Sequence, residues 1–293
     1  MKISSLHSLL DKHIRTLSLA IGERHAKKLD ALNRARNYIK DEFLAIGLAV
    51  DEQVYEFEGV EFANLEAVMP GLEKPEEVII VGAHYDSEKG TPGANDNASG
   101  VAAMLAIAHD LKDYKPARTI KFVAFANEEA PYFDTEGMGS LRYARLAREA
   151  GVNIVAMLSL ETMAYFTAGE GSQKYPSGLD GLELPEEGNF IAFVSDKAGE
   201  ELLNKLTGLF ALFSSVPVKS LCAGAEISHA ALSDHRSFQQ AGYCAVMVTD
   251  TAPFRYPYYH HKDDTPDKLN MKVYKEVVLG LTACTGALAG KVG

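Results

Sequence analysis

The sequence predicts an α/β fold, a three-layer α/β/α sandwich in which helices cover both faces of a mixed, mostly parallel central sheet. Two observations lead to this prediction. Short runs that are apolar at every position recur along the chain, as in strands that are buried on both faces. Segments with apolar residues at helical spacing separate these runs, which is the order expected where helices connect parallel strands.

The elements follow in order from these patterns. Two amphipathic helices are expected between residues 6 and 47, broken near Ile21–Gly22, and the loose alternation over 53–69 suggests strands. Continuous apolar runs predict strands at 78–83, 120–126, 154–160, 190–194 and 243–248. Helical spacing predicts helices at 98–111, 140–150, 200–213 and 272–288. No linker divides the sequence, so residues 1–293 are expected to form one domain, with the helices of 1–50 packed on it.

Composition narrows the class of partner and the compartment. Lys and Arg total 29 against 40 Asp and Glu, a net charge of −11, so neither nucleic acid nor an anionic membrane is expected as a partner. The sequence shows no signal-peptide pattern and no membrane-spanning run, which favours a cytoplasmic protein, and it leaves the oligomeric state open. Three widely spaced cysteines argue against a thiolate zinc site, while a single Cys222–Cys244 disulfide remains an open alternative.

Polar side chains follow the predicted strands at the edge where ligands bind in sheets of this kind. Those that come after the strands, or in the turns and loops beside them, are His84, Asp86, Asp96, Glu128, Glu129, Glu161 and His260. Imidazoles and carboxylates without thiolates are ligands for Zn²⁺, and less often for Co²⁺ or Mn²⁺. Two histidines and three carboxylates exceed the needs of one tetrahedral ion and suit two ions with a bridging carboxylate, leaving one glutamate as a general base.

Each of these residues also has an ordinary structural interpretation. Asp96 or Asn97 could cap the helix over 98–111, and the pair Glu128–Glu129 could be solvated. His260 and His261 could form a pH-sensitive surface pair. Because all of these residues are predicted to surround one pocket, a metal site explains them better together than separate coincidences do. The sequence contains no GxSxG, GxGxxG or HExxH motif that would favour another chemistry.

Several motifs in series resemble the M28 family of co-catalytic zinc aminopeptidases over roughly residues 75 to 270. The motifs are GAHYDS at 82–87, PGANDNASG at 92–100, NEE at 127–129 and HHKDDT at 260–265. The resemblance implies two Zn²⁺ ions, with Glu128 as the general base, Asp86 as the partner that orients His84, and His84, Asp96, Glu129, Glu161 and His260 as the metal ligands. Glu161 stands where many members have aspartate, which is a departure from the pattern.

The resemblance also places residues around the last motif. His260 rather than His261 should be the ligand, because the family pattern has an Asp-Thr pair four residues later. Ser233-Asp234-His235 resembles a supporting block of the family. Tyr259 and His229 are candidate donors to the oxyanion, although aromatic packing would also explain Tyr259.

The implied activity is removal of N-terminal residues from peptides by a zinc exopeptidase. Alternatives on the same scaffold are a glutaminyl-cyclase-like acyltransferase with one zinc, a carboxypeptidase or a deacylase; a non-catalytic metal-binding relative is a further possibility. The aperiodic segment 167–188 is rich in Gly, Pro and acidic residues, and its composition alone favours a solvated surface loop. Because it follows Glu161 closely, we expect it to overhang the pocket through Tyr175, Leu179 and Leu182.

Overall fold

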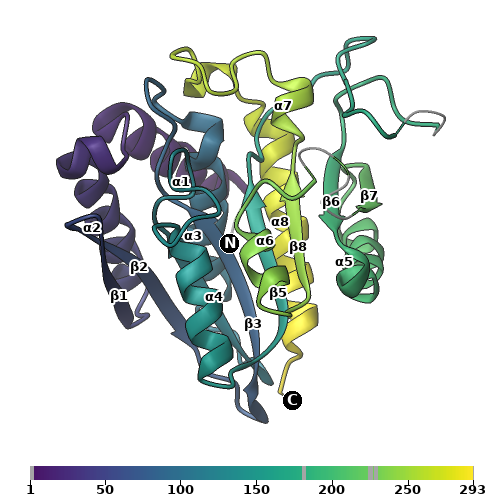
Figure 1. Cartoon of the computed structure of the whole chain (residues 1–293). Helices are drawn as coiled ribbons and strands as arrows, with labels where there is room; N and C mark the ends of the chain where they lie inside the picture. Colours follow the sequence, from purple (N-terminus) through teal and green to yellow (C-terminus); the bar gives the residue numbers. More distant parts are fainter. Residues whose placement is uncertain (1–2, 180–182, 224–226, 228–229, 293) are drawn as a thin grey trace.

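The fold is built on one mixed sheet between two layers of helices (Figure 1). The computed structural model describes residues 3–179, 183–223, 227 and 230–292. Within this part of the chain, helices that combine the length and the apolar character needed to cross a membrane are absent. The three-layer α/β/α class predicted from the sequence is confirmed.

The strands lie in the order β1-β2-β4-β3-β5-β8-β6-β7 across the sheet. Strand β3 is parallel to both β4 and β5, and β5 is parallel to β8, while β1–β2, β2–β4 and β6–β8 are antiparallel pairs. The strands are β1 (Val50–Phe57), β2 (Val60–Met69), β3 (Lys74–His84), β4 (Arg118–Phe125), β5 (Asn153–Glu161), β6 (Ile191–Ser195), β7 (Val218–Cys222) and β8 (Ala245–Thr249).

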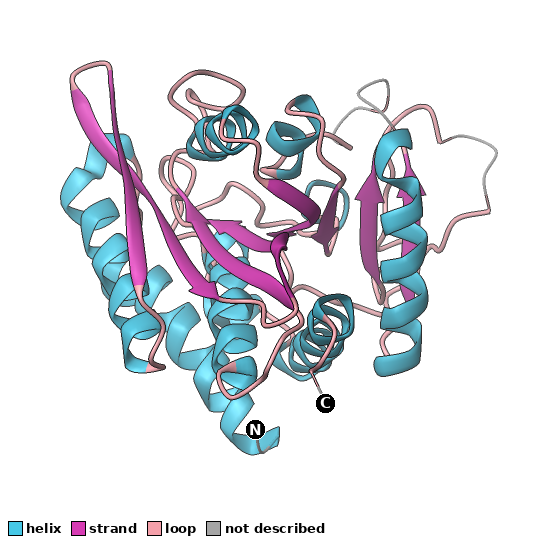
Figure 2. Ribbon diagram, turned by 90° about the horizontal axis from the view of Figure 1, so that it is seen from below, coloured by secondary structure: helices cyan, strands magenta, loops and turns pink. Residues whose placement is uncertain are grey.

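Helices cover both faces of the sheet (Figure 2). The larger layer contains α1 (Ile3–Arg15), α2 (Leu29–Ala45), α3 (Gly100–Leu111), α5 (Glu200–Phe213) and α8 (Met271–Ala289), which pack on one another. The opposite layer contains α4 (Gly139–Glu149) and α6 (His235–Gln240). Shorter helical segments are η1 (Thr16–Ile21), η2 (Ala26–Lys28), η3 (Ala94–Ser99), η4 (Lys197–Gly199), α7 (Ala252–Arg255) and η5 (Pro266–Lys268).

Alternation along the central strands explains why they are apolar throughout. On β3, Ile79 and Val81 belong to the core beneath the larger helix layer, while Val78 and Ile80 belong to the core on the opposite face. Successive strand residues point to opposite faces, so a strand that is covered on both sides needs an apolar residue at every position. The apolar runs in the sequence therefore mark the centre of the sheet.

The prediction missed elements that are short or exposed. The strand β7 lies at the sheet edge and contains the exposed Lys219, Ser220 and Cys222, so it has no apolar run. Helix α6 is only six residues long, too short to show a period. The alternative of a Cys222–Cys244 disulfide is wrong, since both cysteines are free.

Candidate metal centre

His84 and Glu161 meet because they end two adjacent parallel strands. His84 is the last residue of β3, and Glu161 is the last residue of β5. Gly82 pairs with Ser159, so continuing this register by two residues brings the two side chains to the same level. His84 Nε2 lies 3.2 Å from Glu161 Oε2. The carboxyl edge of the sheet thus supplies one histidine and one carboxylate to the same point.

Asp96 connects two histidines that lie far apart in the sequence. Its Oδ1 lies 3.4 Å from His84 Nε2, and its Oδ2 lies 3.1 Å from His260 Nε2. Asp96 is therefore not the cap of α3. Asn97 instead caps the turn that leads into α3, because its Oδ1 accepts a hydrogen bond from the N–H of Gly100, the first residue of α3, at 3.0 Å. With the helix capped by its neighbour, the Asp96 carboxylate faces the histidines.

Glu129 and His260 form the other half of the cluster. Glu129 Oε2 lies 3.4 Å from His260 Nε2. His261 instead lies beside Asp263 on the surface, so His260 is the histidine that reaches the cluster. Glu128 Oε2 stands further off, 3.9 Å from His84 Nε2. Glu88, which the sequence did not single out, also offers a carboxylate close to Glu129 and His260.

Two aspartates hold the backbone of the cluster in place. Asp86 accepts hydrogen bonds from the N–H groups of Glu128 and Glu129, both at 3.1 Å, and its Oδ1 lies 3.3 Å from His84 Nδ1. This is the position beside His84 that the sequence predicted for Asp86. The contact of Asp86 with the Glu128–Glu129 backbone could not be predicted from the sequence.

Asp264 does the same for the turn that carries Asp96. It accepts hydrogen bonds from the N–H groups of Asn95 and Asp96, at 2.8 and 3.1 Å, and from the Tyr256 hydroxyl at 2.8 Å. The carboxylates of Asp86 and Asp264 thus fix the two loops that carry Glu129 and Asp96.

The cluster concentrates negative charge in a buried space. His84 is 1% exposed, and the exposed fractions of Asp96 and Glu128 are 2% and 7%. Burial alone would lower the pKa of His84, but the Glu161 and Glu128 carboxylates raise it well above its ordinary value. Burial would raise the pKa of Asp96, but hydrogen bonds with His260 and His84 hold it below its ordinary value. The carboxylates thus strongly favour positive charge at this point.

The donor atoms fit metal coordination. Nε2 of His84 and Oε1 of Glu129 are buried without a hydrogen-bond partner among the described residues, which is costly unless another group satisfies them. Two atoms that ligate one tetrahedral Zn²⁺ at its usual bond lengths lie about 3.4 Å apart. The spacings between the two histidines and Asp96, Glu161 and Glu129 run from 3.1 to 3.4 Å. The residues therefore suit a metal bound by nitrogen and oxygen ligands.

The remaining predicted residues surround this cluster. Ser233 Oγ donates a hydrogen bond to Glu161 Oε2 at 2.8 Å, so the block at 233–235 supports a candidate ligand. Tyr259 stacks on the His260 ring, with a centroid distance of 3.8 Å, and lines the neighbouring cavity. His229, the other candidate oxyanion donor, lies outside the described residues.

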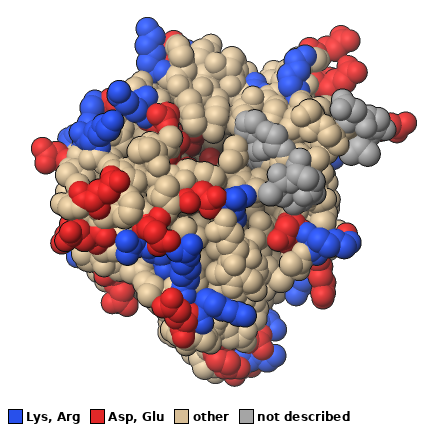
Figure 3. Space-filling view, viewed as in Figure 1, with Lys and Arg blue, Asp and Glu red and all other residues tan. Residues whose placement is uncertain are grey.

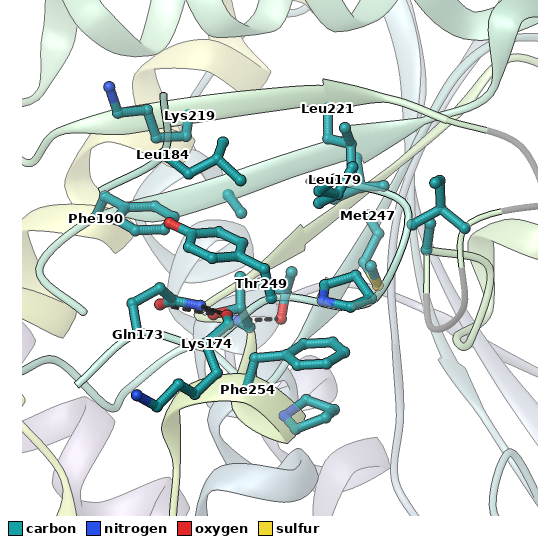
Figure 4. A pocket seen from close by; sticks show the side chains of 18 of the residues that line it. Gln173, Lys174, Leu179, Leu184, Phe190, Lys219, Leu221, Met247, Thr249 and Phe254 are labelled. Carbon is teal, nitrogen blue, oxygen red and sulfur yellow. Dashed lines mark hydrogen bonds between the residues drawn. The ribbon is translucent and has the colours of Figure 1, made fainter. Parts of the chain in front are cut away.

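A cavity of about 170 Å³ opens beside Glu161 and Tyr259. Tyr175 and Leu179 of the 167–188 loop line it, while Leu182 lies outside the described residues. Figure 4 shows Leu184, Leu221, Met247 and Phe254 around the same space. Figure 3 shows acidic side chains in a hollow near the upper centre of the molecule. A mainly apolar cavity thus adjoins an acidic, metal-competent cluster.

Comparison with known proteins identifies the family. The model of "Peptidase family M28" matches residues 64–284, about three quarters of the chain. The chain belongs to peptidase family M28. All the candidate ligands of this M28 peptidase lie inside the matched segment, whereas α1, α2 and β1 precede it.

Relatives of this M28 peptidase include a protein of Escherichia coli (strain K12) described as uncharacterized protein YfbL. It is 34% identical over 280 residues, which cover 93% of this chain and 85% of that protein. A probable leucine aminopeptidase of Arthroderma otae is 28% identical over 233 residues, which cover 74% of this chain and 56% of the relative.

Solved structures share the fold of the M28 peptidase. A zinc aminopeptidase from Bacillus subtilis matches with a TM-score of 0.76 and 15% identity, covering 97% of this chain and 95% of that one. A glutaminyl cyclase from Fimbriiglobus ruber matches with a TM-score of 0.68 and 20% identity, covering 95% and 94%. One fold thus accommodates both a hydrolase and a cyclase, so the activity must be argued from the site.

Proposed function

We propose that this M28 peptidase is a dizinc aminopeptidase that removes the N-terminal residue of peptides. The observation that carries the proposal is the arrangement of two donor sets that share Asp96. His84, Asp96 and Glu161 form one set, and Asp96, Glu129 and His260 form the other. A carboxylate that faces two histidines from its two oxygens suits two ions a few ångströms apart.

Zinc is the proposed metal because the donors are imidazoles and carboxylates, and because structural relatives are named as zinc enzymes. Co²⁺ and Mn²⁺ accept the same donors. When bound, the ions would lower the pKa of a water molecule and polarise the peptide carbonyl. The residues of the chain would orient the ligands, exclude bulk water and move the proton.

Glu128 is the proposed general base because it is buried beside both donor sets without joining either set closely. Its nearest oxygen lies 3.9 Å from His84 Nε2, beyond the spacings within the sets. Its carboxylate would take a proton from the water that attacks the carbonyl carbon. It would then deliver that proton to the amine nitrogen as the C–N bond breaks.

The cavity beside Glu161 would receive the side chain of the first substrate residue. Its walls include Leu179, Phe190 and Met247, so apolar side chains should be preferred. The free amino group of the peptide would lie against the carboxylates of the cluster, where positive charge is favoured. This would restrict cleavage to the first peptide bond.

The test is the substitution Glu128→Gln, which keeps the shape of the side chain and removes the base. We expect kcat on an apolar aminoacyl anilide to fall by about 10²- to 10⁴-fold while zinc content stays the same. Glu149→Gln, at an exposed position at the end of α4, is the matched control and should keep full activity. Near-normal turnover by Glu128→Gln would remove Glu128 from the role.

A cyclase is the second candidate, favoured by the structural likeness to a glutaminyl cyclase. A cyclase would release ammonia from peptides that begin with glutamine and would be expected to hold a single zinc. Retention of both His84 and Glu161 favours two ions and hydrolysis. Ammonia release from such a peptide, with one zinc per chain, would favour the cyclase instead.

A further inference from the structure

Arg24 is a fully buried charged residue that lies between η1 and η2, outside the segment matched by the family model. The guanidinium donates to backbone carbonyls rather than to side chains. Nε donates to the carbonyl of Tyr85 at 2.8 Å, Nη1 to that of Pro92 at 2.7 Å, and Nη2 to that of Gly93 at 3.0 Å. Nη1 also donates longer hydrogen bonds to backbone carbonyls of the N-terminal segment that contains Arg24.

These carbonyls belong to the two ends of one loop. Tyr85 directly follows His84, and Gly93 precedes Asp96 by three residues. A single planar guanidinium therefore ties together the two ends of the segment that separates these two candidate ligands. Its donors point in fixed directions, so the bonds set the distance between the ends as well as their orientation.

Further bonds from the same short segment hold the middle of the loop. The backbone N–H of Arg24 donates to Ser87 Oγ at 3.1 Å, and the Ser87 N–H donates to the Arg24 carbonyl at 2.8 Å. The Gly90 N–H donates to Glu23 Oε1 at 2.7 Å. Residues 23–24 thus contact the loop at its beginning, middle and end.

Gly93 makes the close approach of the guanidinium possible. Its φ is +63°, and a Cβ there would lie 2.3 Å from the Asp96 carbonyl oxygen and 3.2 Å from Arg24 Nη2. The loop is therefore built around the buried cation, and its path toward Asp96 has no room for a side chain at this position.

The charge of Arg24 is costly to bury, and no carboxylate among the described residues forms a direct ion pair that would compensate it. Burial lowers the pKa of Arg24 to about 10, although Asp86, Asp264, Asp96 and Glu129 act in the opposite direction. The side chain thus stays cationic behind a site crowded with carboxylates. An apolar side chain could fill this space but could not bind the loop carbonyls.

We propose that Arg24 is a positioning residue that fixes the segment from His84 to Asp96, so that both side chains face one metal ion before it binds. The N-terminal helical region would then contribute to metal binding and would not serve only to pack on the rest of the protein. This inference rests on the ligand assignment of the proposed function.

The experiment measures zinc affinity by competition with a chromophoric chelator, using the full chain stripped of metal. Arg24→Met and Arg24→Lys should each bind zinc about 10- to 100-fold more weakly than the unsubstituted protein, the range typical of residues that support metal ligands. Arg24→Lys keeps the charge but not the fork of donors, so it should weaken binding less than Arg24→Met.

Arg255→Met is the matched control. Arg255 is also a buried arginine whose pKa burial lowers to about 10, but its guanidinium contacts Gln173 and the Phe190 carbonyl instead of the ligand loop. Its loss should leave zinc affinity unchanged. Thermal unfolding of each metal-free variant shows whether the protein folds, so that an effect on zinc is separated from a loss of fold.

Several outcomes would overturn the proposal. A folded Arg24→Lys or Arg24→Met with unchanged zinc affinity would make Arg24 a packing residue only. If neither variant folds, Ser87→Ala removes the hydrogen bond between the loop and the backbone N–H of Arg24 and should weaken zinc binding in the same direction; unchanged affinity there would equally refute positioning by residues 23–24. An unsubstituted protein that binds no zinc would contradict the proposed function instead, so the two failures are distinct.

Discussion

Single residues in this site hold the backbone in place as well as the candidate ligands. Asp86 stands beside His84 Nδ1 and also accepts the N–H groups of Glu128 and Glu129. One carboxylate thus orients an imidazole and a neighbouring ligand loop at the same time. Partners of metal-binding histidines fix the ring and its tautomer, so their loss weakens the site without removing a ligand.

Asp86→Asn should therefore weaken zinc binding. The amide keeps the size of the side chain but replaces one oxygen with a donor, which would face either the histidine or a backbone N–H. We expect zinc affinity to fall by about 10- to 100-fold in chelator competition. Asp113→Asn, at an exposed position after α3, is the control. Equal affinities in the two variants would contradict the role of Asp86.

Residue identity predicted some contacts better than others. His84, Asp96 and Glu161 were predicted because each is a metal-binding residue type placed beside a predicted strand or turn, and the structure brings them together. Their assignment as ligands stays a prediction. Arg24 gave no such signal, because its contacts join segments that are distant in sequence and only the folded backbone defines them.

Among the elements, the close packing of the first residue of α3 against strand β5 determines the geometry of the site. Gly100 is the first residue of α3, and a Cβ there would lie 2.3 Å from the Leu160 carbonyl oxygen and 2.4 Å from Asn97 Oδ1. The absence of a side chain lets the turn that carries Asp96 lie directly against the strand that carries Glu161. Long buried strands were predictable from their apolar runs, whereas the edge strand β7 had no such run.

A pair of glycine substitutions tests this packing. Gly100→Ala should destabilise the metal-free protein by about 1–3 kcal/mol, because the methyl group overlaps fixed backbone and side-chain atoms. Gly208→Ala is the control, since Gly208 lies within α5 and an added Cβ there would have no described atom within 4 Å; this substitution should stabilise the helix by about 0.5–1 kcal/mol. Urea unfolding measures both. Equal changes in the free energy of unfolding for the two variants would show that α3 does not pack tightly against β5.

At the scale of the whole molecule, the site exists only in the folded chain. Its candidate ligands span residues 84 to 260, and each donor set joins segments that are distant in sequence. The fold brings them to the carboxyl edge of one sheet, beside an apolar cavity. Zinc binding and peptide recognition should therefore both depend on the same folded structure.

Zinc titration of the metal-stripped protein, read by its activity on leucine anilide and on N-acetylated leucine anilide, tests the central claim most directly. The rate on the free-amine substrate should rise until two zinc ions are bound per chain. The acetylated substrate should hardly be cleaved, because its acylated nitrogen carries no positive charge. Zinc-independent activity, or equal rates on the two substrates, would contradict a dizinc aminopeptidase.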